Sequence, residues 1–386
     1  MFSDDRLRTM LSSVAEDPTP SPAFVDGLWD TLARERRRPV ARWQGFPLPL
    51  AATLAALMLL LLALLALSGH PNPPVLGGIV GKVDVAGTSR TLLAAGETVI
   101  LGWPGHQGRI DTYAASVPGT THAYNDVAFG PAGWWVAGPE RLQPWTPTGN
   151  RGWVPAAGPT IDAHATALAV GETEIVARTS PLELSVFDTR NGALKGSLQV
   201  GATVEFAIAA GALWAVTEAD QAHILRVLDL TTGRERAGPA RFGPQTSIAV
   251  SPDSVWLADA AARRIFRFDP ASGRQRAAVN VGLIPLVLAL DPDGFVWVVG
   301  WPADASPGAL IGWVDPATNA AHVRQLDLSE VGIATQTRPW QGQMFGLAVT
   351  REAAWVGLSE TSFEGEHQPG PVGSSIVRVA IDRTAR

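Results

Sequence analysis

Short apolar segments recur along the chain at spacings of about 40 residues, and the last spacing is near 60. Several carry Trp: VILGW (99–103), WWVAG (134–138), EIVAR (174–178), LWAVT (213–217), VWLAD (255–259), VWVVG (296–300) and AWVGL (354–358). All but the first follow a second apolar run: DVAFG (126–130), ALAV (167–170), EFAIA (205–209), SIAV (247–250), LVLAL (286–290) and GLAV (346–349). Short apolar runs between turn residues indicate buried strands, so the pattern predicts a repeated β unit.

Each unit continues into an alternating strand that ends, in the clearest cases, in an Asp-containing turn. These segments are LSVFDTRNG (184–192), LRVLDLTTG (225–233), IFRFDPASG (265–273) and IGWVDPATN (311–319). An Asp side chain can bond the turn backbone, and Gly or Asn supplies the left-handed residue of a tight hairpin. We therefore interpret Asp269, Asp291, Asp293 and Asp315 as turn caps and not as a metal-binding carboxylate cluster.

Four antiparallel strands in each unit of about 40 residues are typical of a β-propeller blade. Seven Trp-type second strands predict an all-β, seven-bladed propeller over residues 79–386, with six or eight blades as alternatives. The Trp residues are expected to pack between adjacent blades. The chain ends on a third strand (374–382), so we expect residues 79–87 to supply the missing outer strand and close the ring.

A different pattern precedes the repeats. Residues 47–67 carry no charge and are long enough to cross a bilayer as one helix, with Trp43 and Phe46 at its cytoplasmic end. Five arginines precede this run: Arg34, Arg36, Arg37, Arg38 and Arg42. No basic residue follows it before Lys82, which predicts a single-pass bacterial membrane protein with a cytoplasmic N-terminus and an extracytoplasmic C-terminal domain. A cleaved signal peptide is the alternative.

The first 46 residues are expected to form a cytoplasmic tail with two short amphipathic helices, and residues 68–78 a linker. Leu7, Met10, Leu11 and Val14 share one face, and Val25, Leu28, Trp29 and Leu32 share another. Such short helices are marginal alone, which favours a cytoplasmic protein partner. The alternative is a segment that only sets membrane topology and binds nothing.

Composition narrows the chemistry. The chain has no cysteine, which excludes disulfides and thiolate chemistry, and its net charge of −6 argues against nucleic-acid binding. Seven histidines are scattered without ligand spacing and are interpreted as solvated loop residues: His70, His106, His122, His164, His223, His322 and His367. We expect no cofactor, no metal and no catalytic residue.

The long loops are the candidate binding elements. Those between second and third strands and between blades should share one face: 103–108, 120–126, 301–308, 334–344 and 359–373. The ligand-binding candidates on them are Trp103, His106, Trp301, Arg338, Trp340, Gln341, Glu366 and His367. Ordinary surface loops are the alternative interpretation.

The strand, DP-x-T/S-G turn and Trp pattern over residues 79–382 resembles the virginiamycin B lyase-like, YVTN and NHL propellers. The lyase's catalytic histidine and glutamate match no position in this chain. The N-terminal 70 or so residues resemble the cytoplasmic end of membrane-anchored anti-sigma factors, without the zinc motif that many of those carry, since the chain has no cysteine.

These features favour a non-enzymatic membrane-anchored sensor or interaction protein with a signalling role. Its propeller would bind an unknown ligand or partner outside the cell, and its tail a cytoplasmic regulator such as a sigma factor. A membrane-tethered propeller lyase or hydrolase is one alternative, and an envelope structural or assembly factor is another.

Overall fold

The structure of the protein is a computed structural model that describes residues 73–383 apart from short gaps. The gaps are 86–90, 96–97, 104–105, 110–125, 139, 148–152, 221, 245, 305, 307, 332, 334–342 and 362–370. Residues 73–386 form one compact unit. The expected tail, membrane segment 47–67 and residues 68–72 of the linker lie outside the described residues. Within the described part, no helix has the length and apolar character that a membrane crossing requires.

The described strands form seven antiparallel sheets, numbered here as blades 1 to 7 by their inner strands. Blade 1 holds β2 (Thr91–Ala95), β3 (Thr98–Trp103) and β4 (His106–Arg109). Blade 2 holds β5 (Asp126–Gly130), β6 (Gly133–Ala137), β7 (Leu142–Pro147) and β8 (Trp153–Pro155), and blade 3 holds β9 (Leu168–Val170), β10 (Glu174–Arg178), β11 (Glu183–Asp188) and β12 (Leu194–Gln199). Blade 4 holds β13 (Thr203–Ala209), β14 (Ala212–Ala219), β15 (Ala222–Asp229) and β16 (Glu235–Phe242).

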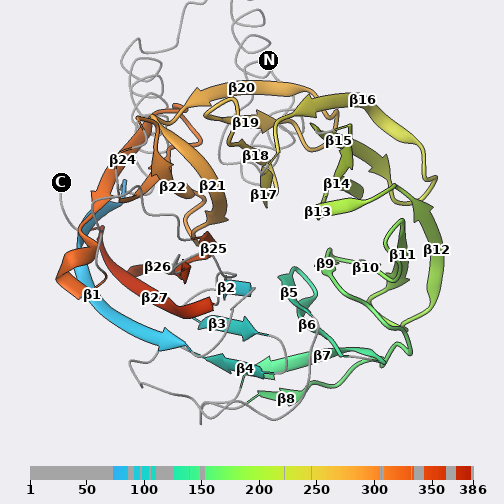
Figure 1. Ribbon diagram of the computed structural model, residues 1–386. Coiled ribbons are helices and arrows are strands. Elements are labelled where there is room, and N and C mark those ends of the chain that lie inside the picture. Colours follow the sequence, from blue (N-terminus) through green and yellow to red (C-terminus); the bar gives the residue numbers. More distant parts are fainter. Residues whose placement is uncertain are drawn as a thin grey trace, which may run out of the picture. The chain divides into compact units, whose positions relative to one another are not determined.

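Blades 5 to 7 follow the same order. Blade 5 holds β17 (Thr246–Val250), β18 (Val255–Asp259), β19 (Arg264–Phe268) and β20 (Gln275–Asn280), and blade 6 holds β21 (Leu283–Leu290), β22 (Val296–Pro302), β23 (Ala309–Val314) and β24 (Ala321–Leu326). Blade 7 holds β25 (Gln343–Val349), β26 (Ala353–Thr361), β27 (Pro371–Asp382) and β1 (Val75–Val85). The inner strands contact one another in turn and return from β25 to β2, so the ring is closed (Figure 1).

The expected fold class needs correction. Complete four-stranded blades number six, and blade 1 has three strands among the described residues, so the expectation of seven equal four-stranded blades is wrong. The described chain is all-β, with one short 3-10 helix, η1 (Leu328–Val331), and no α-helix. The expected combination of helices with a propeller is therefore corrected to a propeller alone for this part of the chain.

The predicted closure of the ring is confirmed. Strand β1 pairs antiparallel with β27, from Val75 opposite Asp382 to Val85 opposite Ser374 (Figure 1). It begins inside the segment expected to be linker, because Leu76 also packs against the core of blades 6 and 7. Arg324 Nη1 of blade 6 donates to the carbonyls of Leu76 and Gly77 at 2.8 and 2.7 Å, which fixes the closing strand to its neighbour.

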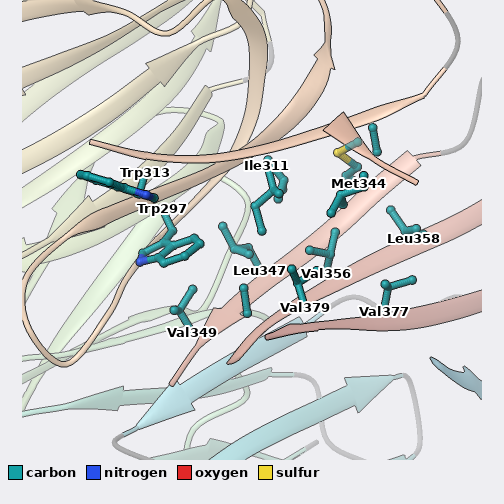
Figure 2. Packing of buried hydrophobic residues seen from close by; sticks show 14 of the residues in the cluster. Trp297, Ile311, Trp313, Met344, Leu347, Val349, Val356, Leu358, Val377 and Val379 are labelled. Carbon is teal, nitrogen blue, oxygen red and sulfur yellow. The ribbon is translucent and has the colours of Figure 1, made fainter. Parts of the chain in front are cut away.

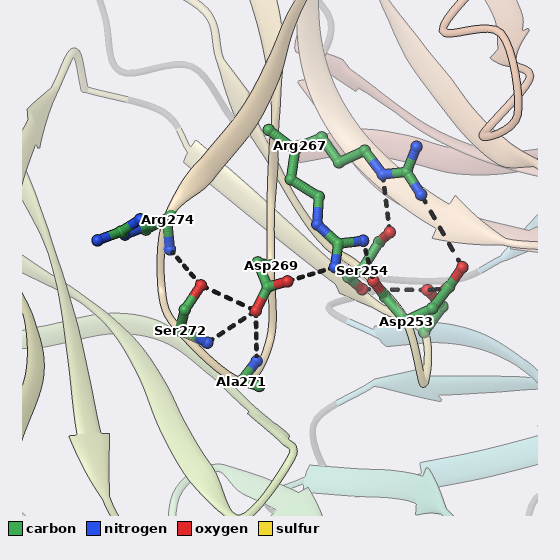
Figure 3. A network of polar contacts seen from close by, with 9 residues as sticks. Asp253, Ser254, Arg267, Asp269, Ala271, Ser272 and Arg274 are labelled. Atoms are coloured by element: carbon green, nitrogen blue, oxygen red, sulfur yellow. Dashed lines mark hydrogen bonds and ion pairs between the residues drawn. The ribbon is translucent and has the colours of Figure 1, made fainter. Parts of the chain in front are cut away.

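The interpretation of the Asp residues as turn caps is confirmed for Asp269, Asp291 and Asp315, whereas the Asp293 carboxylate forms ion pairs with Arg351 and Arg383. Asp269 accepts hydrogen bonds from the amides of Ala271 and Ser272 at 3.0 and 2.7 Å, and from the Ser272 hydroxyl at 2.9 Å (Figure 3). It also pairs with Arg276, seven residues further on, whose guanidinium reaches the Asp253 carbonyl. Asp188 with Lys195 and Asp229 with Arg236 repeat this spacing in blades 3 and 4.

The same interpretation holds for Asp291, which does more than cap its turn. Its buried carboxylate accepts from the Phe295 amide and from Trp297 Nε1, each at 2.9 Å, and from Arg383 at 2.5 Å. Arg383 follows β27 and also pairs with Asp293 at 3.0 Å. This cluster joins blade 6 to the end of the closing blade. Removing one partner of such a buried ion pair leaves an uncompensated charge, so the cluster depends on both.

Trp residues fill five of the junctions between blades, as predicted. Each lies on a second strand, directly opposite an Ala of the inner strand, in the pairs Ala128–Trp135, Ala207–Trp214, Ala249–Trp256, Ala289–Trp297 and Ala348–Trp355. Each indole packs against the next blade, as Trp297 of blade 6 does in the cluster that it shares with Val349 of blade 7 (Figure 2). The small Ala leaves room for the large ring in a close-packed interior.

The junction between blades 3 and 4 is filled by other residues than Trp. Val176 takes the Trp position there, opposite Ala169. The facing residue on the next inner strand is Phe206, where the Trp junctions have Leu or Ile. The larger Phe thus compensates for the smaller Val.

This compensation predicts coupling between the two positions. Val176→Trp alone should lower the free energy of unfolding by about 1–3 kcal/mol through overpacking, and Phe206→Leu alone by on the order of 1 kcal/mol through lost contacts. The double variant should lose less than the sum, because it recreates the Trp–Leu pair of the other junctions. Urea unfolding measures this. As a control, the effects of Val176→Trp and the distant Ile311→Val on the free energy of unfolding should add within about 0.5 kcal/mol. If the effects of Val176→Trp and Phe206→Leu are also additive, the compensation is contradicted.

Candidate functional site: the loop face

The meander order of each blade places two kinds of connection on one face of the ring. Each chain segment enters a blade at its inner strand and leaves from its outer strand, through antiparallel neighbours. The turns between second and third strands therefore share a face with the connections between blades. We call this surface the loop face.

The structure describes three of the eight predicted site residues. Trp103 and His106 lie opposite each other at the hairpin between β3 and β4, at the loop face. Trp301 is not a loop residue: it belongs to β22, pairs with Ile284, and its half-buried ring packs against the core of blades 6 and 7. Arg338, Trp340, Gln341, Glu366 and His367 lie outside the described residues.

A set of polar side chains near the loop-face ends of the inner strands was not singled out from the sequence. Asp126 accepts a hydrogen bond from the Leu168 amide of the next blade at 2.8 Å. Ser247 accepts from the Leu288 amide of its next blade at 3.2 Å. Each precedes the apolar run of its inner strand by one position, which is the signal that could have identified them. These bonds join neighbouring blades near the axis of the ring.

Glu205 occupies the same position in blade 4 and has the clearest electrostatic signature. It accepts hydrogen bonds from the Ile248 amide of blade 5 and, at 3.5 Å, from the Ser247 hydroxyl. Burial raises the pKa of Glu205 to about 7, although both hydrogen bonds act in the opposite direction. A carboxyl group that changes charge near neutral pH therefore lies between two blades.

In blade 7, the position that corresponds to Glu205 is limited by the inner strand of the next blade. Gly346 is the equivalent residue, and a Cβ there would lie 2.5 Å from Cβ of Leu92 in blade 1. No side chain fits at that distance. The position thus holds a hydrogen-bonding side chain in blades 2, 4 and 5, and glycine in blade 7, where the neighbouring strand leaves no room.

One histidine corrects the expectation of solvated loop residues. His223 is buried, and its Nδ1 lies 2.8 Å from Thr246 Oγ1 of the next blade. His322 instead stacks on Trp313, with ring centroids 4.1 Å apart. Among the described residues, no group of three or more His, Asp or Glu side chains is arranged to hold a metal ion. His223 and His322 therefore make packing and hydrogen-bonding contacts within the propeller.

The environment of Glu205 predicts a pH dependence of stability. Its folded-state pKa of about 7 lies above its ordinary value of 4.5, so the folded chain binds more protons than the unfolded chain between these values. The free energy of unfolding should therefore fall as pH rises from 4.5 to 7, by on the order of 2 kcal/mol. Glu205→Gln should flatten this slope in urea titrations, whereas Glu218→Gln, an exposed carboxyl of the same blade, should keep it. An unchanged slope in Glu205→Gln would contradict the assignment.

Comparison with known proteins identifies the fold. No family model matches the chain, and no curated protein matches it. Among solved structures, the WD40 domain of Pan2 from Neurospora crassa is 14% identical, with a TM-score of 0.55 over 81% of this chain and 97% of that one. A chain of the mitotic checkpoint complex is 11% identical, with a TM-score of 0.51 over 78% of this chain and 94% of that one. At these identities, the likeness shows a WD40-like β-propeller fold.

Proposed function

We propose that the chain is a non-enzymatic interaction protein whose propeller binds a partner protein through the loop face. One of the similar folds belongs to a chain of a protein assembly, the mitotic checkpoint complex. The proposal is carried by the structural roles of the repeated Trp and Asp residues. The Trp residues fill blade junctions and the turn Asp residues cap hairpins, so the repeats build a closed ring that presents one face of connecting loops.

Within the described residues, no particular side-chain arrangement favours the lyase or hydrolase alternative. Glu205, the carboxyl group with the raised pKa, bonds a backbone amide and a serine hydroxyl of the adjacent blade. These hydrogen bonds join blades 4 and 5. The resemblance to lyase-like propellers therefore supports the fold and adds nothing on chemistry.

A photo-cross-linking amino acid placed on opposite faces of one blade tests the proposal. Glu218 is exposed near the loop-face end of β14, and Thr231 is exposed in the turn between β15 and β16 on the opposite face. The cross-linker at position 218 should give a defined protein adduct in living cells, and at position 231 it should give none. Identical adducts at both positions, or adducts at 231 alone, would contradict binding through the loop face.

We further propose that the propeller acts outside the cytoplasm as a sensor, attached to the membrane through residues 47–67, with residues 1–46 engaging a cytoplasmic regulator. The support comes from sequence: an uncharged apolar run of bilayer length, preceded by five arginines. The anti-sigma-like arrangement of the tail supports a sigma factor as the regulator.

Protease accessibility tests this placement. In bacterial spheroplasts, external protease should degrade an epitope added after Arg386, while an epitope added before Met1 should survive until the membrane is permeabilised. Both epitopes should remain in the membrane fraction after a carbonate wash. Protection of the C-terminal epitope would reverse the orientation, and release of the chain by carbonate would exclude stable attachment.

A further inference from the structure

An apolar patch lies on the loop face at the junction of blades 3 and 4. Leu182 and Val204 are 54% and 46% exposed, which is high for large aliphatic side chains. They extend the buried contact between these blades, because Leu184 and Phe206, two residues further along the same strands, belong to its core. The interior of the junction thus continues onto the surface. Pro181 and Ala202 are exposed beside them.

Hydrogen bonds hold the two sides of this patch together. The Val200 amide donates to the Leu182 carbonyl at 3.1 Å, which brings the turn of blade 3 against the connection to blade 4. Arg178 Nη1 donates to the Thr203 carbonyl at 2.8 Å, next to Val204. The patch is therefore a fixed surface made by two blades.

Arg178 gives the patch a charge. Its guanidinium is held by neutral groups, the Thr203 carbonyl and, through Nε at 2.9 Å, the Thr166 hydroxyl. Two arginines of blade 4 have carboxylate partners: Arg226 pairs with Glu235 at 2.7 Å, and Arg236 with Asp229 at 2.7 Å. Among the ion pairs of the described residues, Arg178 has no such partner. A positive charge thus lies beside exposed aliphatic side chains on a chain of net charge −6.

We propose that this patch binds an acidic, apolar peptide segment of a partner protein. An aliphatic side chain of the segment covers Leu182 and Val204, and a neighbouring carboxylate pairs with Arg178. Carboxylates suit the guanidinium, whose planar fork can donate two hydrogen bonds to one carboxylate. This inference rests on the proposed interaction function and names the chemistry of the segment that is bound.

Synthetic peptides test the charge preference directly. The probes are a fluorescein-labelled 12-residue peptide of alternating Glu and Leu and its Lys–Leu counterpart, titrated with the purified full-length chain at constant salt. Fluorescence anisotropy should show at least tenfold tighter binding of the Glu–Leu peptide. Arg178→Gln should reduce this preference to less than threefold, and Leu182→Ser with Val204→Ser should weaken the binding of both peptides.

Matched variants elsewhere on blade 3 provide the controls. Arg190→Gln removes an exposed arginine from the turn on the opposite face, and Leu194→Ser removes an exposed leucine from the outer strand. Neither should change peptide affinity, and the thermal midpoint of each variant confirms folding. Equal affinity for both peptides, or a preference that survives Arg178→Gln, would overturn the proposal. If that happens while the cross-link at position 218 stands, the interaction function survives without this patch.

Discussion

The filling of the space between neighbouring blades is the constraint on which the rest of the structure depends. Sheets arranged around an axis bury their faces only against one another, so every junction must be packed without voids. Trp opposite Ala fills five junctions, and at the junction of blades 3 and 4 the larger Phe206 supplies part of the volume that Val176 lacks. The repeats can diverge in sequence as long as each junction stays filled. This explains why the Trp pattern is clear although the blades differ in most other residues.

A second set of interactions is polar. Near the axis, Asp126, Glu205 and Ser247 bond the backbone of the next blade. Toward the rim, the turn aspartates pair with basic residues seven positions on within the same blade. The two sets differ in their response to conditions. Packing is insensitive to pH, whereas the Glu205 carboxyl changes charge near neutrality. Stability of the junction between blades 4 and 5 is thus linked to proton binding.

Much of this architecture could be predicted from the sequence because it repeats. The period, the turn Asp residues and the pairing of the two ends each leave a local pattern, and β1 with β27 confirms the last of these. The compensation by Phe206 could not be predicted, because it depends on which residue faces it across a junction. The raised pKa of Glu205 could not be predicted either, because Glu205 lies in an ordinary strand and its pKa is raised by burial between two blades. Trp301 was assigned to a loop, but its strand extends to Pro302, so the aromatic ring packs inward.

The closing strand has a consequence for how this domain is made. Strand β1 leaves the ribosome first among the described strands, and its partner β27 lies roughly 300 residues later, so blade 7 cannot form until those residues have been made. During that time, β1 presents backbone groups that no neighbour satisfies, which is the state in which strands pair with wrong partners. Blades 2 to 6 use consecutive strands and can form as they emerge. The two ends can therefore join only after the other blades are able to form, and β1 stays without its partner strand until then.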